Sequence, residues 1–290
     1  MIYYGMVNTA SSSAYTSPAL RSFFRHTELG PSDRFFLIDN DGGYEVPAGF
    51  DRVEVIRNPQ PQSFARNVNA IIRRAAEVGA DVIFPNNDVI FGPGWLEPLM
   101  ARDDAILIPL CNQFQLYSLD DFALQPTMDL ADFEGREAQF DEMVRRHQTE
   151  CVTHKYVGAS HISFFCFRIP RRIYAALGLF DENFGRGGGE DVDYRIRAHL
   201  AGFDVCMAAE SFLLHFMGKS TWRGGEAAEQ TQTRNEAYLS YFRQKWGEDL
   251  ARVFLFTGDW RTAIAQLGVQ QMIDGGDYLG AIRQLLSRRC

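Results

Sequence analysis

The feature that most constrains the fold is an alternation of short apolar runs with helical periodicity over about the first 215 residues. Ser63 is a predicted helix N-cap, an apolar face follows it at helical spacing, and Gly79 ends the helix. This alternation predicts an α/β domain whose helices cover a mostly parallel sheet. The predicted strands are rich in residues that favour β-structure: residues 2–7, 34–38, 53–56, 82–84, 105–109 and 163–168.

Composition and charge exclude several classes of protein. With 290 residues, 46% of them hydrophobic, the chain has enough material for one large domain with an appendage or for two modest domains. A net charge of -8 argues against broad nucleic-acid binding, because phosphate backbones attract clustered Lys and Arg. The five cysteines form no C-x-x-C pair, and we find neither an export signal nor a transmembrane segment. We therefore expect a cytoplasmic protein, with peripheral membrane contact and oligomerisation left open.

The pattern changes after His215, first to a glycine-containing loop and then to helical periodicity. We place a boundary near residue 223, which gives a main domain at residues 1–223 and a helical C-terminal extension at residues 224–290. Residues 112–150 are polar and irregular, with one predicted helix at 136–147. Four aromatic residues at helical spacing in the extension predict a face that packs against the main domain or a partner subunit: Tyr238, Tyr241, Phe242 and Trp246.

Polar residues follow two of the predicted strands, and ligands of open α/β sheets bind beyond the carboxyl ends of strands. Asp39 ends the second strand and is a candidate for hydrogen bonds to a ribose or base, an Asx turn being the alternative. Asn86, Asn87 and Asp88 interrupt an apolar run after the fourth strand. A carboxylate beside two carboxamides suits a hard cation that bridges to a diphosphate, with a simple turn as the alternative.

Two further segments carry side chains suited to chemistry. A glycine-rich loop at residues 185–189 precedes a helix whose first turn holds Glu190 and Asp191. Adjacent acids there suit general-base work, or they interact with the helix dipole. His215 ends a later apolar strand, as either a structural histidine or a metal ligand, and Lys219 lies in the basic loop behind it. The helix has an apolar face that we expect to point inward: Val192, Ile196 and Leu200.

Taken in order, these segments resemble the inverting GT-A glycosyltransferases of bacterial family two, including rhamnosyltransferase-like members, over about residues 1–223. Asp39 is similar to the family's first nucleotide-contacting aspartate, and Phe64-Ala65-Arg66-Asn67 resembles its helix-opening Ala-Arg-Asn signature. Asn86-Asn87-Asp88 resembles the Asp-x-Asp metal motif but lacks its first aspartate, so only Asp88 carries over. Two other segments are similar to recurring family segments: Gly94-Trp95-Leu96 and Phe180-Asp181-Glu182-Asn183-Phe184.

The resemblance implies a GT-A fold, which is a Rossmann-like nucleotide-binding mixed sheet flanked by helices, here with a helical C-terminal extension. It also implies inverting hexosyl or deoxyhexosyl transfer from a UDP-, dTDP- or GDP-linked sugar to a glycan or another hydroxyl acceptor, as in polysaccharide biosynthesis. Glu190 and Asp191 match the family's Glu-Asp position, where Asp191 is the expected general base. His215 matches a late histidine that completes metal binding with Asp88, for Mn²⁺ or Mg²⁺.

The remaining predicted contacts are those with the nucleotide-sugar donor. We expect Asp39, Arg66, Asn87 and Lys219 to bind the donor nucleotide or its phosphates, and the loop at residues 219–223 to close over the diphosphate.

Two other functions are possible for such a sequence. A sugar-nucleotide nucleotidyltransferase is the first alternative, although residues 8–15 lack the glycines and arginine of its phosphate loop. A non-catalytic nucleotide- or carbohydrate-binding protein is the second, because the first metal-motif aspartate is missing.

Overall fold

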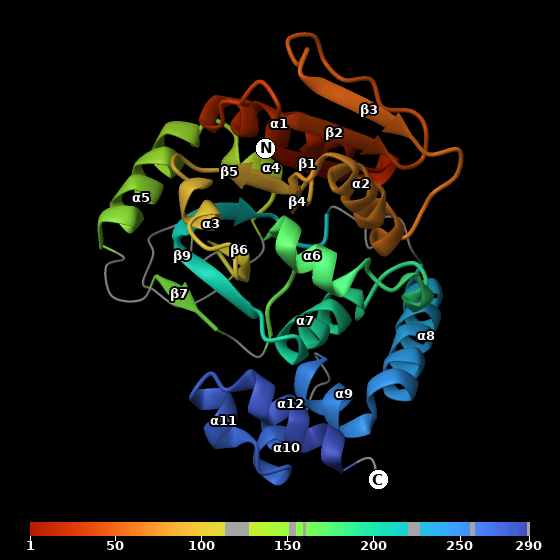
Figure 1. Cartoon of the computed structure of the whole chain (residues 1–290). Coiled ribbons are helices and arrows are strands. Elements are labelled where there is room, and N and C mark those ends of the chain that lie inside the picture. Colours follow the sequence, from red (N-terminus) through yellow and green to blue (C-terminus); the bar gives the residue numbers. More distant parts are fainter. Residues whose placement is uncertain (114–127, 151–154, 159–160, 220–226, 256–258, 289–290) are drawn as a thin grey trace.

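The computed structural model contains one large mixed sheet, flanked by helices and followed by a group of C-terminal helices (Figure 1). The strand order is β3-β2-β1-β4-β8-β6-β9-β5, with β7 paired to β9. The strands are β1 (Ile2–Asn8), β2 (Arg34–Asp39), β3 (Val53–Arg57), β4 (Asp81–Pro85), β5 (Val89–Phe91), β6 (Ala105–Cys111), β7 (Tyr156–Val157), β8 (Cys166–Ile169) and β9 (Asp204–His215). The structure describes residues 1–113, 128–150, 155–158, 161–219, 227–255 and 259–288.

The helices fall into two groups along the chain. Those of the main domain are α1 (Ser13–His26), α2 (Phe64–Val78), α3 (Glu97–Met100), α4 (Leu130–Phe133), α5 (Glu137–Glu150), α6 (Arg171–Leu177) and α7 (Glu190–Leu200), with short 3₁₀ turns η1 (Ala10–Ser12) and η2 (Glu182–Phe184). Those of the C-terminal part are α8 (Ala228–Trp246), α9 (Glu248–Phe254), α10 (Trp260–Gln266), α11 (Gln270–Asp274) and α12 (Tyr278–Ser287).

Helices cover both faces of the sheet, as neighbouring residues of β1 demonstrate. The ring of Tyr4 packs against Phe23 of α1, with 5.0 Å between the ring centroids. The next residue, Gly5, faces α2 so closely that a Cβ there would lie 2.6 Å from Ile71. Because successive residues of a strand point to opposite faces, α1 and α2 lie on opposite sides of the sheet. The predicted α/β fold is therefore confirmed, with β5, β7 and β8 as its antiparallel members.

Local signals placed α2 well, whereas one predicted strand was too long. The Ser63 hydroxyl accepts the Arg66 backbone N–H, and Gly79 ends the helix with a left-handed φ of 73°. The strand predicted at residues 163–168 begins only at Cys166. The residues before it leave the sheet, and the carbonyl of Phe165 accepts the backbone N–H of Asn86 at 2.6 Å. The prediction was wrong there because an apolar run does not distinguish sheet pairing from loop contacts.

Two hydrophobic clusters divide the interior, and α7 contributes to both. The larger one lies on the sheet, whereas the second joins α8–α12 to one face of α7. Val192 and Ile196 belong to the second cluster, so the apolar face predicted to point inward packs against the C-terminal helices (Figure 1). The aromatic residues of α8 pack there as well, as predicted, and Phe242 is fully buried. The boundary placed near residue 223 lies outside the described residues.

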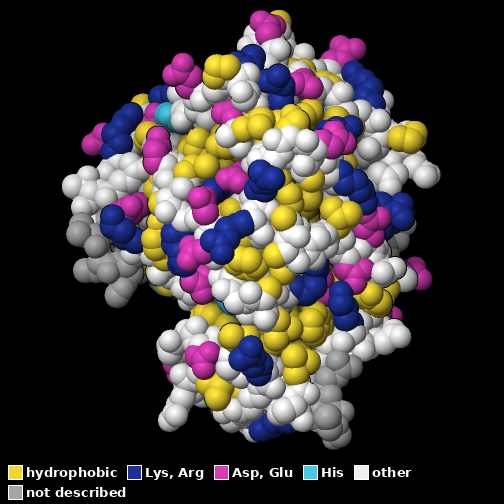
Figure 2. All heavy atoms as spheres, in the orientation of Figure 1, with side chains coloured by type: hydrophobic (Ala, Val, Ile, Leu, Met, Phe, Trp, Pro, Cys, Tyr) yellow, Lys and Arg dark blue, Asp and Glu magenta, His cyan; other side chains and the backbone are white. Residues whose placement is uncertain are grey.

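Two features of the exterior are the character of its helices and the distribution of its charged side chains. None of the helices among the described residues combines the length and the apolar character that crossing a bilayer requires. On the face shown in Figure 2, basic and acidic side chains are interspersed across both the main part and the C-terminal part.

Candidate functional site

The predicted site residues collect along one edge of the sheet. β1, β2 and β4 are parallel, with Asn8 opposite Asp39 at their carboxyl ends. β8 runs antiparallel to both β4 and β6, and β9 is parallel to β6, so β9 points the same way as β4. Asp39 at the end of β2, Asp88 just after β4 and His215 at the end of β9 therefore share the carboxyl edge, where ligands of such sheets bind.

Asp88 and His215 form a buried pair at this edge. Oδ1 of Asp88 lies 3.4 Å from Nε2 of His215, and the Asp88 side chain is fully buried. Burial by itself would lower the pKa of His215, but the charge and hydrogen bonding of Asp88, together with those of Cys111, outweigh it and raise that pKa to about 10. The ring of Phe165 stacks on the imidazole, with centroids 4.7 Å apart, and fixes its plane.

A left-handed turn after β9 brings a backbone amide to Asp88. Met217 has a φ of 50° and Gly218 a φ of 74°, an arrangement that is costly for a residue with a side chain. The turn directs the Lys219 N–H at Oδ2 of Asp88, 2.9 Å away. The Lys219 ammonium group instead pairs with Asp129 at 2.9 Å. The rest of the loop predicted to close, residues 220–223, lies outside the described residues.

The Asp88–His215 pair fits a divalent cation only if a bound ligand supplies further coordinating atoms. In the part of the chain that the structure describes, no three His, Cys, Asp or Glu side chains gather into a metal-binding group. Two adjacent ligands of a cation with bonds of about 2.1 Å lie roughly 3 Å apart, close to the separation observed here. Diphosphate oxygens suit the remaining positions, since hard cations prefer oxygen.

Asp39 is held by one oxygen and presents the other. Its Oδ2 accepts the backbone N–H of Tyr44 at 3.1 Å and Nη1 of Arg57 at 2.9 Å. Its Oδ1 is buried and has no hydrogen-bond partner among the described residues. A buried carboxylate oxygen without a donor is costly, so this atom is suited to accept a hydrogen bond from a ligand.

In this structure, the side chains of Asn87 and Arg66 contact residues other than the predicted site residues. The Asn87 amide donates to the hydroxyls of Ser12 and Thr16, each at 2.8 Å, and so ties the end of β4 to η1 and α1. The Arg66 side chain is exposed and pairs with Glu182 at 3.2 Å. Neither contact involves Asp39, Asp88 or His215. Both residues remain sequence-based predictions as donor contacts.

Glu190 and Asp191 begin α7 in a desolvated environment. The Gly188 N–H donates to Oε2 of Glu190 at 2.5 Å, which folds the glycine loop onto the helix. Burial and then repulsion from Asp191 raise the pKa of Glu190 to about 7. Burial raises the pKa of Asp191 too, and Arg195 opposes that rise. Two adjacent carboxylates with raised pKa values suit an exchange of protons, and the pKa of Glu190 lies near neutral pH.

The segment Phe164–Phe165 connects the acidic pair to the Asp88–His215 pair. The backbone of Phe164 is hydrogen-bonded to Asp191, which lowers the pKa of that carboxyl. Phe165, the next residue, stacks on His215 and binds the backbone of Asn86. Asp191, the candidate base, and His215 of the candidate metal pair thus contact consecutive residues.

Helix α8 covers the glycine loop, which the sequence did not reveal. Nη1 of Arg234 donates to the Gly187 carbonyl at 3.1 Å. Gly188 has a φ of 124°, and a Cβ there would lie 2.5 Å from the ring of Tyr238. Lys245 pairs with two acids at once, Asp181 and Asp193, each at 2.6 Å. These contacts join residues from 47 to 64 positions apart, so no local pattern predicts them.

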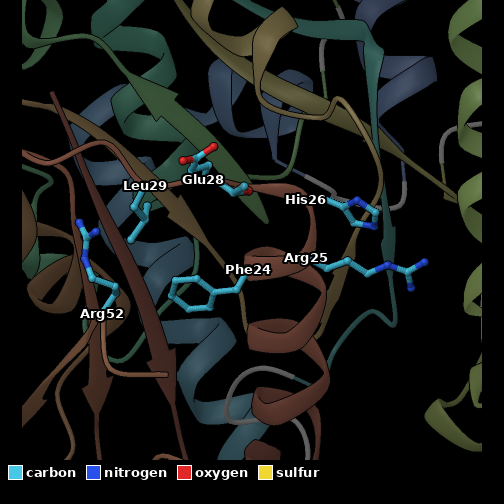
Figure 3. A pocket seen from close by; sticks show the side chains of 7 residues that line it. Phe24, Arg25, His26, Glu28, Leu29 and Arg52 are labelled. Carbon is cyan, nitrogen blue, oxygen red and sulfur yellow. The ribbon is translucent and has the colours of Figure 1, made fainter. Parts of the chain in front are cut away.

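An open hollow of about 560 Å³ lies away from this site, around the end of α1. Phe24 and Leu29 lie between Arg52 on one side and Arg25 and His26 on the other (Figure 3). These residues flank the beginnings of β2 and β3, the edge opposite the carboxyl ends. We therefore place the candidate site at Asp39, Asp88, Asp191 and His215 rather than here.

The fold and the polar residues at its carboxyl edge define the GT-A class of nucleotide-binding α/β domains. GalNAc-T7, solved in a crystal structure with UDP, GalNAc and Mn²⁺, shares this fold with a TM-score of 0.57 at 14% identity. The alignment covers 88% of this chain and 50% of that one. More particularly, this chain belongs to the glycosyltransferase-like family 2, whose pattern matches residues 44–245. The match includes most of α8.

A curated relative extends the comparison. A galactofuranosyl glycosyltransferase from Leishmania donovani is 23% identical over 245 residues. The alignment covers 70% of this chain, which spans 56% of that protein.

Proposed function

We propose that this chain transfers a glycosyl group from a nucleotide-diphosphate sugar to a hydroxyl acceptor with inversion, in a metal-dependent reaction. The observation that carries the proposal is a pair of contacts with consecutive residues. The Phe164 backbone contacts Asp191, and the Phe165 ring stacks on His215. A base for the acceptor and ligands for the donor diphosphate must lie on either side of one anomeric carbon, and this arrangement suits that requirement. Family membership favours it over a nucleotidyltransferase.

In the proposed reaction, Asp191 takes the proton of the acceptor hydroxyl as its oxygen attacks the anomeric carbon. Asp88 and His215 would hold the divalent cation, which when bound neutralises charge on the leaving diphosphate. Asp39 accepts a hydrogen bond from the nucleoside through its open Oδ1. Inversion follows because the base and the leaving group lie on opposite faces of the sugar.

Glu190 has a different proposed role from its neighbour. Its carboxylate accepts the Gly188 N–H, so it shapes the glycine loop and takes up a proton near neutral pH.

Lys219 and Arg66 are the proposed phosphate contacts. Lys219 is paired with Asp129 and Arg66 with Glu182, so each must leave its acidic partner to contact the donor phosphates.

The relatives point to a UDP-linked hexosyl donor and Mn²⁺, since GalNAc-T7 was solved with UDP, GalNAc and Mn²⁺ and the curated relative is named a galactofuranosyl glycosyltransferase. We propose this donor class first, with dTDP- and GDP-sugars next. Rhamnosyl transfer, a glycan acceptor in polysaccharide biosynthesis and cytoplasmic location stay predictions from the sequence.

Thermal unfolding with Mn²⁺ and each of UDP, dTDP and GDP tests the donor site without knowledge of the acceptor. A nucleotide at a hundred times its dissociation constant adds about 2.7 kcal/mol of stability, which shifts the melting temperature by several degrees. We expect one nucleotide to produce this shift, only with metal, and Asp88→Ala to abolish it.

Asp51→Ala is the matched control, because this exposed acid lies before β3 at the opposite edge. It should keep the full shift. A shift that survives Asp88→Ala would remove Asp88 from the site, and nucleotide binding without sugar transfer would favour the non-catalytic alternative. Release of pyrophosphate would favour the nucleotidyltransferase.

A further inference from the structure

Arg195 is a buried arginine one helical turn after Asp191. Its side chain is 2% exposed, and within the described ranges neither Nη1 nor Nη2 has a hydrogen-bond partner. The guanidinium carbon lies 5.6 Å from the ring centroid of Phe254 in α9. An arginine used only to fill space would leave its donors unsatisfied for no gain, because a methionine or leucine fills such a position without that cost.

Helix geometry places Arg195 on the same face of α7 as Asp191. Residues four positions apart lie on the same face of an α-helix, and side chains tilt toward the helix N-terminus. Arg195 and Asp191 therefore share one face of α7, and the long Arg195 side chain can extend back toward the first turn of the helix. Electrostatic attraction acts between the two groups, and each favours the charged form of the other.

The other titratable groups around Arg195 do not neutralise it. Burial, followed by repulsion from Arg195, lowers the pKa values of His161 and His199 to about 4, so both are uncharged at neutral pH. Burial raises the pKa of the Tyr278 hydroxyl, which is neutral as well. Glu190 faces Asp191 from the same helix and Arg234 faces Glu190 from α8. Among these described groups, the Asp191 carboxylate is the anion that balances Arg195.

We propose that Arg195 is a positioning residue for Asp191: its buried charge keeps the Asp191 carboxylate ionised, so that Glu190, and not Asp191, takes up the proton that the two acids share. This inference rests on the proposed role of Asp191 as the general base. It explains why two adjacent carboxylates in one desolvated site have different roles, since only Asp191 has a guanidinium one turn along the helix.

Carboxyl titration of the intact protein tests the coupling directly. ¹³C-labelled aspartate and glutamate side chains are followed by NMR against pH, and the Asp191 signal is assigned by its loss in Asp191→Asn. We expect Arg195→Met to raise the pKa of Asp191 by about 1 to 3 units, because an opposite charge nearby is lost. Arg195→Lys should keep most of the native value. Arg195→Gln is a second neutral variant, and thermal unfolding establishes that each variant is folded.

Arg197→Met is the matched control on the same helix. Arg197 pairs with Asp193 at 2.9 Å, so its loss should leave the Asp191 titration unchanged. An Asp191 pKa that is the same in the native protein and in both neutral Arg195 variants would overturn the inference. So would an equal change in Arg197→Met, because the effect would then come from a general disturbance of α7.

Kinetics separates this inference from the proposed function. With the donor found by thermal unfolding, the acid limb of kcat/KM should move to higher pH in Arg195→Met by the same interval as the Asp191 pKa, with donor KM unchanged. Arg195→Lys should restore it. If the NMR shift is observed but Asp191→Asn retains full transfer, the charge coupling stands and the assignment of Asp191 as base fails.

Discussion

At the scale of single residues, the proposed function depends on which of two neighbouring carboxylates acts as the base. Asp191 contacts the Phe164 backbone and has Arg195 one turn away, whereas Glu190 is engaged by the Gly188 amide. Glu190→Gln retains an oxygen that can accept this amide N–H. Asp191→Asn replaces the carboxylate with an amide, which cannot take up a proton near neutral pH.

We therefore predict that Asp191→Asn lowers the transfer rate by about 10²- to 10⁴-fold and leaves donor affinity unchanged, the usual loss for a positioned base. Glu190→Gln should lower it by less than about tenfold. Single-turnover release of the nucleoside diphosphate, together with nucleotide binding by calorimetry, measures both quantities. A dead Glu190→Gln beside an active Asp191→Asn would reverse the two roles.

At the scale of elements, α8 holds the glycine loop and the start of α7 in place. Burial would raise the pKa of Asp181, but its hydrogen bonds, first that with Lys245, lower it to about 2. A depressed carboxyl pKa stabilises the folded state at pH values above the ordinary aspartate value. This contribution disappears as the pH falls from about 4 to 2.

Lys245→Met should lower the free energy of unfolding by about 1 to 2 kcal/mol at pH 7, because Asp181 loses the first of the three partners whose hydrogen bonds depress its pKa. The difference from the native protein should shrink as the pH approaches 3. Urea unfolding at several pH values measures it. Lys155→Met, which removes an exposed pair with Glu210, should change stability by less than about 0.5 kcal/mol. A deficit that is independent of pH would indicate lost packing instead of lost charge.

Local sequence predicts some features of these elements, such as where a helix begins and ends, whereas other features depend on contacts between distant residues. Ser63 and Gly79 fixed α2 because a cap and a left-handed glycine act within one turn. The order of motifs brought Asp88 and His215 to the same edge, where the structure places them 3.4 Å apart. The direction of the Asn87 amide depends on α1, more than seventy positions away, and no local pattern encodes it.

At the scale of the whole molecule, the two hydrophobic clusters share α7. Trp95 is buried in the first cluster, whereas Ile282 is fully buried in the second. Val192 and Ile196 place the helix that carries Asp191 in the second cluster as well. Loss of the C-terminal packing therefore disturbs the site helix, and we expect the two clusters to unfold together.

Ile282→Ala should lower the free energy of unfolding by about 2 to 5 kcal/mol, as removal of buried methyl groups does in a core. Its unfolding should remain a single transition in which a ¹⁹F label at Trp95 and far-UV circular dichroism change together. Val78→Ala, at a side chain that is 48% exposed, is the control and should have little effect. Separate midpoints for the Trp95 label and the helical signal would contradict the shared role of α7.

The sharing of α7 between two clusters also limits how this protein can be recombined with its relatives. A chimera that exchanges only α8–α12 would set a foreign helical surface against the native Val192 and Ile196, and would replace the ring that packs on Gly188. The natural unit of exchange therefore begins upstream of the glycine loop, near Gly178, and runs through α12. Domain grafting that aims to change the proposed donor or acceptor preference should place its junction there and not between the main domain and the C-terminal helices.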